Sequence, residues 1–158
     1  ALATEADAAC GQILADLGRP AEGLALAEEA GAEARAAGSE VADAWAHAVQ
    51  GSILLRVDPA AAAERAAEAL AAGRRLGYAA GISTNLRTLA LAALLRGDPP
   101  AAAARVGELL DDLLRRGSTY ELRMVLDTAS SVLAAAGRPA EAADLAATAL
   151  SLPACEVR

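Results

Sequence analysis

Few side chains in this chain of 158 residues have the types and spacing that chemistry requires. His47 is the single histidine, and neither an HExxH motif nor any other metal-ligand spacing surrounds it. Cys10 and Cys155 lie near opposite ends of the chain, without the close pairs of a zinc site. No Ser–His–Asp set can be argued from one histidine. The pattern predicts a packed histidine on a helix face, no bound metal and no catalytic triad.

Two further patterns resemble functional motifs only in part. Residues 73–77 (GRRLG) lack the Lys-Ser/Thr ending of a phosphate-binding loop, and they fall at a predicted helix end. The acidic pairs at residues 28–29 and 111–112 are adjacent on predicted helices, where such neighbours point to different faces. We expect these carboxylates to be solvated rather than to form a catalytic dyad. The chain is therefore predicted not to be an enzyme and to need no cofactor.

Composition and charge exclude several classes of partner. The 14 basic residues are all arginine, and 21 acidic residues bring the net charge to −7, which repels phosphate backbones. Direct nucleic-acid binding is therefore not expected. No uncharged apolar run approaches the length of a membrane span, and no signal peptide begins the chain. We expect a cytoplasmic protein with two reduced, mostly buried thiols. Because the first residue is not Met, we also expect a fragment of a larger protein.

The elements that must position any site are marked by a recurring turn. Four prolines follow one another at intervals of 39, 40 and 40 residues: Pro20, Pro59, Pro99 and Pro139. Three glycines each lie 18 residues after a proline: Gly38, Gly77 and Gly117. Proline favours the first position of a helix and glycine the position after its end. The spacing predicts one all-α domain, an α-α superhelix of four helix–turn–helix units at residues 1–37, 38–76, 77–116 and 117–158.

Eight helices are expected, because alanine favours helices and strand-forming residues are scarce. Ser39, Asp58 and Ser118 are predicted N-caps. The fifth helix has an open alternative, a loop that extends to Gly81. Ala66 and Ala146 belong to a stripe of small residues that predicts tight contacts between the two helices of a unit. The expected helices span residues 4–17, 20–37, 40–55, 59–76, 78–95, 99–116, 119–136 and 139–152.

Two stretches carry a resemblance to a known family of repeats. Residues 10–23 have the sequence CGQILADLGRPAEG, and residues 137–146 have the sequence GRPAEAADLA. This resembles the tetratricopeptide repeat, with a small residue in the first helix, glycine at the turn and alanine in the second helix. The units are about 40 residues rather than 34. They also lack the repeat-ending proline and the large aromatic residues.

Longer Ala- and Leu-rich repeats of this kind are similar to helical regions of large actinobacterial transcriptional activators. These are the MalT-like and LuxR-type ATPase regulators and the antibiotic-pathway regulators with a bacterial transcriptional activation domain. The resemblance implies a regulatory or sensor part of a transcriptional regulator. The DNA-binding domain and the NTPase of such proteins lie elsewhere in the chain.

The resemblance also implies a binding surface on the concave face, lined by the first helix of each unit. A groove with Trp45, Arg56 and Arg87 would anchor an acidic or aromatic-bearing peptide. The alternative is that the tryptophan fills the core and the arginines are solvated. The carboxylate clamp of some such repeats uses Lys and Asn, which are absent from these positions. The implied partner-binding residues are Glu5, Gln12, Asp16, Trp45, Ser52, Arg56, Thr84, Arg87, Asp127 and Ser131.

The function expected from these observations is non-catalytic binding of a protein, a peptide or another domain of the parent chain. Two alternatives remain open. One is a structural self-association domain, in which exposed Ala and Leu faces of the end helices form a homo-oligomer. The other is a small-molecule pocket inside the superhelix.

Overall fold

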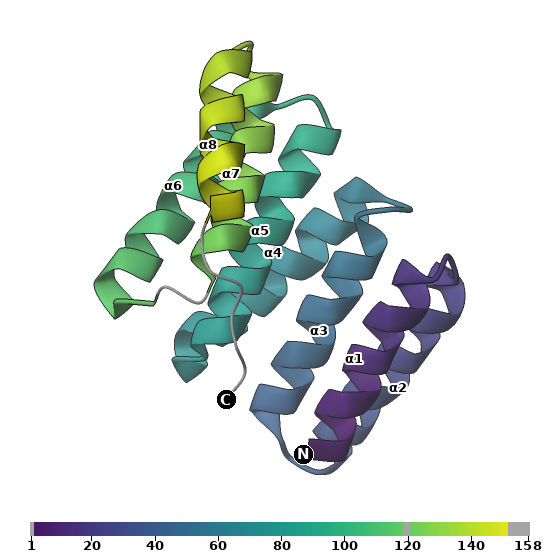
Figure 1. The fold of residues 1–158 in the computed structure, drawn as a ribbon. Helices are drawn as coiled ribbons and strands as arrows, with labels where there is room; N and C mark the ends of the chain where they lie inside the picture. The colour runs from purple at the N-terminus through teal and green to yellow at the C-terminus, as the bar shows by residue number, and fades with distance from the viewer. Residues whose placement is uncertain (1, 119–120, 152–158) are drawn as a thin grey trace.

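The computed structural model describes residues 2–118 and 121–151, and this part of the chain is entirely helical (Figure 1). It contains eight α-helices and no strand, as the sequence predicts. The helices are α1 (Leu2–Asp16), α2 (Pro20–Ala36), α3 (Glu40–Leu54), α4 (Pro59–Leu76), α5 (Ala79–Leu95), α6 (Pro99–Arg116), α7 (Leu122–Ala135) and α8 (Pro139–Ser151).

The helix ends follow the chemistry of the residues that flank them. Asp58 precedes Pro59 and accepts hydrogen bonds from the backbone N–H groups of Ala60 and Ala61, at 3.0 and 3.1 Å. These two donors would otherwise lack a partner in the first turn of α4. The same helix ends at Gly77, whose φ of +64° is a left-handed conformation that glycine adopts without steric cost.

Two local predictions, the Ser118 and Ser39 caps, differ from the structure, and one alternative that the sequence left open does not form. Ser118 does not cap α7, which begins at Leu122 after Glu121, because tertiary contacts of the Glu121 carboxylate fix that helix start. The loop to Gly81 does not form: α5 begins at Ala79 and continues through the polar residues near its start. Ser39 occupies the N-cap position of α3 but makes no capping hydrogen bond.

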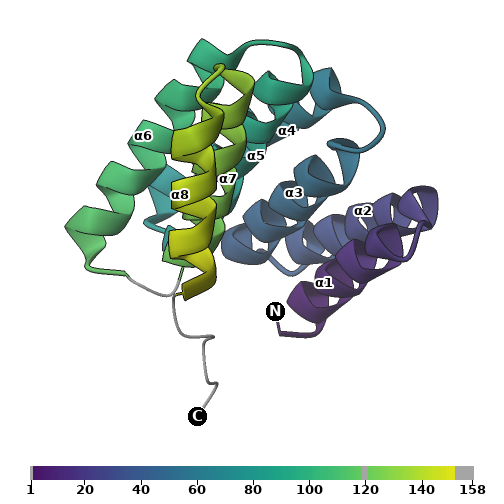
Figure 2. The same ribbon diagram turned by 45° about the horizontal axis from the view of Figure 1, so that its top comes forward.

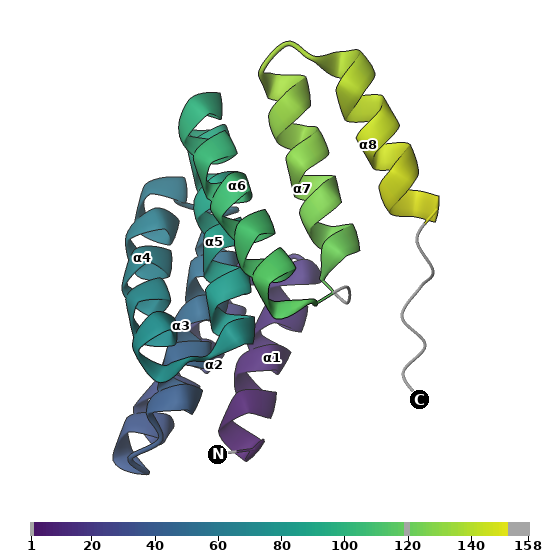
Figure 3. The same ribbon diagram turned by 90° about the vertical axis from the view of Figure 1, so that its left-hand side faces the viewer.

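The helices pack as a series of neighbouring pairs, an arrangement compatible with an α-α superhelix. Among the described residues, α1, α3, α5 and α7 pack against one another in succession, whereas the backbones of the even-numbered helices approach only those of their neighbours in the chain. Figure 2 and Figure 3 show the consecutive helices placed side by side from α1 to α8. The odd-numbered helices therefore form one continuous face of the molecule.

Small residues let the helices approach closely. A Cβ atom on Gly11 of α1 would lie 2.6 Å from the carbonyl oxygen of Gly23 on α2, so the two backbones touch. In the α3–α4 pair, Ala66 is fully buried as predicted. Ala146, expected at an equally tight contact, is only half-buried, because α8 packs against α7 alone. The core consists of alanine with Val, Leu and Ile rather than aromatic side chains.

Candidate functional site

A groove of about 900 Å³ crosses α1, α3 and α5 on the face formed by the odd-numbered helices. We call it the α1–α3–α5 groove. Its apolar lining is Ala9, Ile13, Trp45, Val49, Leu55, Leu91, Leu94 and Leu95, and its polar lining is Gln12, Asp16, Ser52, Arg56, Thr84 and Arg87.

Helical periodicity explains how one groove collects these side chains. The lining positions are 9, 12, 13 and 16 on α1, then 45, 49 and 52 on α3, and 84, 87, 91, 94 and 95 on α5. Steps of three and four residues keep side chains on one face of a helix. Because α1, α3 and α5 contact one another in succession, their three stripes meet in one concave surface.

The groove brings together most of the residues that the sequence singled out. Seven of the ten lie in its lining: Gln12, Asp16, Trp45, Ser52, Arg56, Thr84 and Arg87. Glu5, Asp127 and Ser131 do not line it. The charge of Glu5 acts on Tyr78, whose pKa is raised first by burial and then by this carboxylate. The exposed Ser131 donates to the backbone oxygen of Asp127 at 3.2 Å within α7.

Apart from Trp45, sequence reasoning did not select the apolar residues of the lining. Val49 lies four residues after Trp45, and Leu91 lies four residues after Arg87. The same helical spacing that places the polar residues therefore contained the signal for these side chains. Their number makes the groove mainly apolar, with a few polar groups between the aliphatic side chains.

Trp45 is both a packing residue and part of the groove. Its half-buried ring packs against the core cluster of α1, α2 and α3. It also meets the ring of Tyr78 edge-on, with 6.5 Å between ring centroids and an interplanar angle of 79°. The indole is thus held in one position, and it reports on the groove as the only tryptophan of the chain.

One rim of the groove is fixed by Arg56, which follows α3. Its Nη2 atom lies 2.7 Å from Oδ1 of Asp16, and its Nη1 atom donates to the backbone oxygen of Ala15 at 3.2 Å. Gln12 donates to the same Asp16 oxygen at 3.1 Å. These contacts tie the end of α1 to the end of α3 and leave this arginine and this carboxylate paired with each other.

Arg87 differs from Arg56 because the described residues offer it no hydrogen bond or ion pair. Its Nε atom is buried and has no hydrogen-bond partner among them. Burial lowers the pKa of the Arg87 guanidinium, and the charge of Asp127 opposes this only in part. The groove therefore contains one cation whose charge is not neutralised by direct contact.

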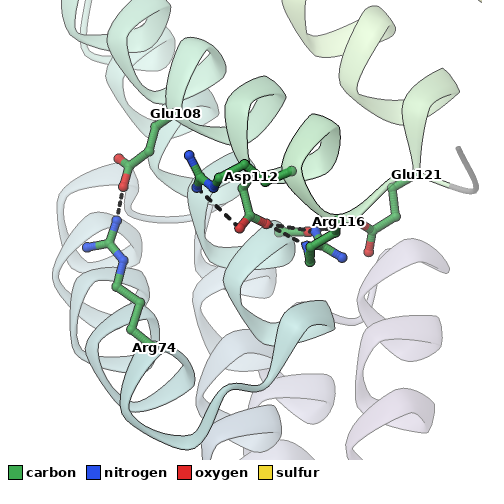
Figure 4. Close-up of polar contacts among 7 residues, drawn as sticks. Arg74, Glu108, Asp112, Arg116 and Glu121 are labelled. Atoms are coloured by element: carbon green, nitrogen blue, oxygen red, sulfur yellow. Dashed lines mark hydrogen bonds and ion pairs between the residues drawn. The ribbon is translucent and has the colours of Figure 1, made fainter. Parts of the chain in front are cut away.

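A cluster of charged groups elsewhere in the fold holds helices together. Figure 4 shows Arg116 of α6 with the carboxylates of Asp112 and Glu121, and the ion pair of Arg74 with Glu108 that joins α4 to α6. Glu121 also accepts from the hydroxyl of the fully buried Ser83 at 2.7 Å, which connects α5 to the start of α7. This cluster is a structural link between α4, α5, α6 and α7.

The remaining chemical side chains form no site within the described residues. His47 lies beside Asp43 and Arg35 between α2 and α3, with its Nε2 atom 3.6 Å from Oδ1 of Asp43. Cys10 is exposed rather than buried as expected, because it lies outside the packed stripe of α1, and Cys155 lies outside the described residues. No group of three or more potential metal ligands is found in this part of the chain.

Comparison with known protein families, with curated proteins and with solved structures found no match. No helix of the described ranges has the length and apolar character needed to cross a membrane.

Proposed function

We propose that the chain is a non-catalytic binding module, a tetratricopeptide-like superhelix of four helical hairpins that holds a protein or peptide segment in the α1–α3–α5 groove. The observation that supports the proposal is the groove itself. Three helices from different hairpins line it with apolar and polar side chains, and its volume is about 900 Å³. Its wall is held by packed helices and by the Arg56–Asp16 pair, so binding does not have to order it first.

An open groove suits a peptide better than an enclosed small ligand. Ile13 and Leu95 both line the groove and keep 58% and 62% of their surface exposed. Sites for small molecules usually bury most of the ligand surface. Exposed aliphatic side chains on the rim instead fit the apolar face of a helix laid into a groove.

The test uses Trp45 as an internal probe. Random dodecapeptides displayed on phage are selected against the purified domain, and the binders are synthesised and titrated while tryptophan fluorescence is recorded. We expect a saturable change in fluorescence that Ser52→Phe, which fills the groove, abolishes. Ser131→Phe on α7 is the matched control and should bind as the wild type does. If no selected peptide changes the fluorescence, or if Ser52→Phe binds normally, the groove is not the binding surface.

Each of the two alternative functions is supported by one specific observation. Leu150 on α8 is 72% exposed, which favours self-association through that helix. The groove volume also lies within the range of roughly 300–1,000 Å³ that small-molecule sites occupy. Sedimentation tests the first alternative, and a thermal-shift screen against metabolites tests the second.

The wider role that we propose is regulatory: a cytoplasmic transcriptional regulator whose sensor part contains these repeats. The support is the sequence pattern of residues 10–23 and 137–146. The parent sequence tests this directly, because a helix-turn-helix domain or a P-loop in the same chain is expected. A parent chain with neither would contradict the regulatory role and leave the binding role intact.

A further inference from the structure

We infer that the α1–α3–α5 groove binds a peptide segment in which large apolar side chains flank one acidic residue, and that the carboxylate pairs with Arg87. This rests on the proposed binding function and makes it specific. The structure supplies three supports: the charges of the lining, the state of Arg87 and the position of the apolar side chains.

The charges of the groove lining do not sum to zero. Asp16 and Arg56 neutralise each other at 2.7 Å, whereas the third charged residue of the lining, Arg87, has no anion in contact within the described residues. Asp127 acts on it through its charge but does not line the groove. The groove thus has a net positive charge in a chain of net charge −7. Such a surface attracts one local carboxylate, while the whole molecule repels an extended polyanion.

The state of Arg87 makes a carboxylate the favoured complement. The Arg87 guanidinium carries an energetic cost, because its Nε atom is buried without a hydrogen-bond partner and burial disfavours its charge. A carboxylate that accepts from it in a bidentate pair compensates this cost and adds directionality. Thr84, one helical turn before Arg87 in the same lining, offers a hydroxyl donor to the same ligand group.

Apolar side chains surround the arginine in the lining. Leu91 and Leu94 continue its stripe on α5, and Trp45 and Val49 face the groove from α3. A ligand that fits must therefore place a carboxylate among aliphatic or aromatic groups. A short peptide does this with side chains on one face of a helix, at spacings of three and four residues.

The experiment compares peptide selections on two forms of the domain. Random dodecapeptides are selected on the wild type and, in parallel, on Arg87→Met, whose thioether chain keeps the length and removes the charge. We expect Asp or Glu beside large apolar residues to be enriched on the wild type and not on Arg87→Met. Circular dichroism melts check folding, and Arg87→Met is expected to melt at the wild-type temperature or above it.

Synthetic peptides then test the pairing itself. Changing the selected Glu to Gln should weaken binding to the wild type by about tenfold or more, since a charge-assisted contact is lost. Arg87→Met should weaken the Glu peptide by the same factor and leave the Gln peptide unchanged. Arg123→Met, which removes an exposed arginine of α7, should bind both peptides as the wild type does.

Three results would overturn the inference. The first result would be peptides that bind the groove but are not enriched in Asp or Glu. That result would support the proposed function and contradict the role of Arg87. Equal enrichment on Arg87→Met would do the same. The third result would be that decanoate changes Trp45 fluorescence at a lower concentration than any selected peptide, and that this change depends on Arg87. That result would assign the site to a free carboxylic acid instead. If no peptide enters the groove, the proposed function itself fails.

Discussion

At the scale of single residues, two glycines make a close helix contact. Gly11 and Gly23 bring the backbones of α1 and α2 together, and a Cβ atom on either would meet the carbonyl oxygen of the other. The fold thus depends here on the absence of a side chain. At Gly107 on α6, by contrast, an added Cβ would have no neighbour within 4 Å.

Gly23→Ala is expected to lower the free energy of unfolding by roughly 1–3 kcal/mol, because the backbone of α1 must shift to admit the methyl group. Gly107→Ala serves as the control. Alanine has the better helix propensity and meets nothing there, so stability should rise by roughly 0.5–1 kcal/mol. Urea unfolding followed by circular dichroism measures both changes. Equal effects of the two substitutions would show that the α1–α2 contact is looser than described.

His47 predicts a pH dependence of stability. Burial lowers its pKa below the ordinary value of 6.5; Asp43 opposes this, Arg65 and Arg35 add to it, and Glu68 opposes it weakly. Between the lowered pKa and 6.5 the unfolded chain binds more protons than the folded one, so stability rises with pH. The stability is complete above 6.5 and is lost as the pH falls from 6.5 through the folded pKa.

The urea midpoint of the wild type should therefore be lower at pH 5.5 than at pH 7.5. His47→Gln removes the only histidine and should flatten this dependence, since carboxylates titrate mainly at lower pH. A wild type that is more stable at pH 5.5 would mean that protonated His47 gains more from Asp43 than it loses by burial.

At the scale of helices, boundaries depend on local chemistry in some places and on tertiary contacts in others. Pro59 and Gly77 mark α4 in the sequence because each residue suits its position through backbone geometry alone. These signals make all eight helices predictable. The start of α7 was not predictable, because Glu121 is held by Ser83 and Arg116 from other helices. No local pattern near residue 118 contains that information.

Two of the three predicted caps, Asp58 and Ser39, provide a matched test. Asp58→Ala removes an acceptor of two backbone N–H groups of α4 and is expected to cost about 1 kcal/mol of stability. Ser39→Ala at the start of α3 removes no capping hydrogen bond and should change stability by only a few tenths of a kcal/mol. Thermal melts of both variants measure the difference. A larger loss for Ser39→Ala would contradict the described geometry of that helix start.

At the scale of the whole molecule, the repeat spacing predicts part of the groove lining and not all of it. The phase of the repeats was sufficient to place residues such as Gln12, Ser52 and Thr84 on one face. Asp127 and Ser131 had the same phase but lie on α7, beyond the three helices that the groove spans. Which helices share a cavity depends on how successive pairs pack, and the period of the sequence does not specify that.

The exposed face of α8 predicts association of the isolated chain. Leu150 is 72% exposed, and α8 packs only against α7 among the described helices. Sedimentation velocity at low and high protein concentration should reveal a concentration-dependent species that Leu150→Glu reduces. Leu114→Glu on α6, where the leucine is 77% exposed, is the control and should leave the species unchanged. A wild type that is monomeric at every concentration would contradict the prediction.

The contacts of the described helices reach no further than two helices along the chain. Such a molecule has low contact order, and proteins of this kind fold in microseconds to milliseconds because no distant segments must meet first. Different parts of the molecule can also open separately. The groove is lined by α1, α3 and α5, so local unfolding of α7 and α8 leaves the groove complete. Hydrogen exchange should accordingly be graded along the chain, with amides of α8 exchanging long before those of α3.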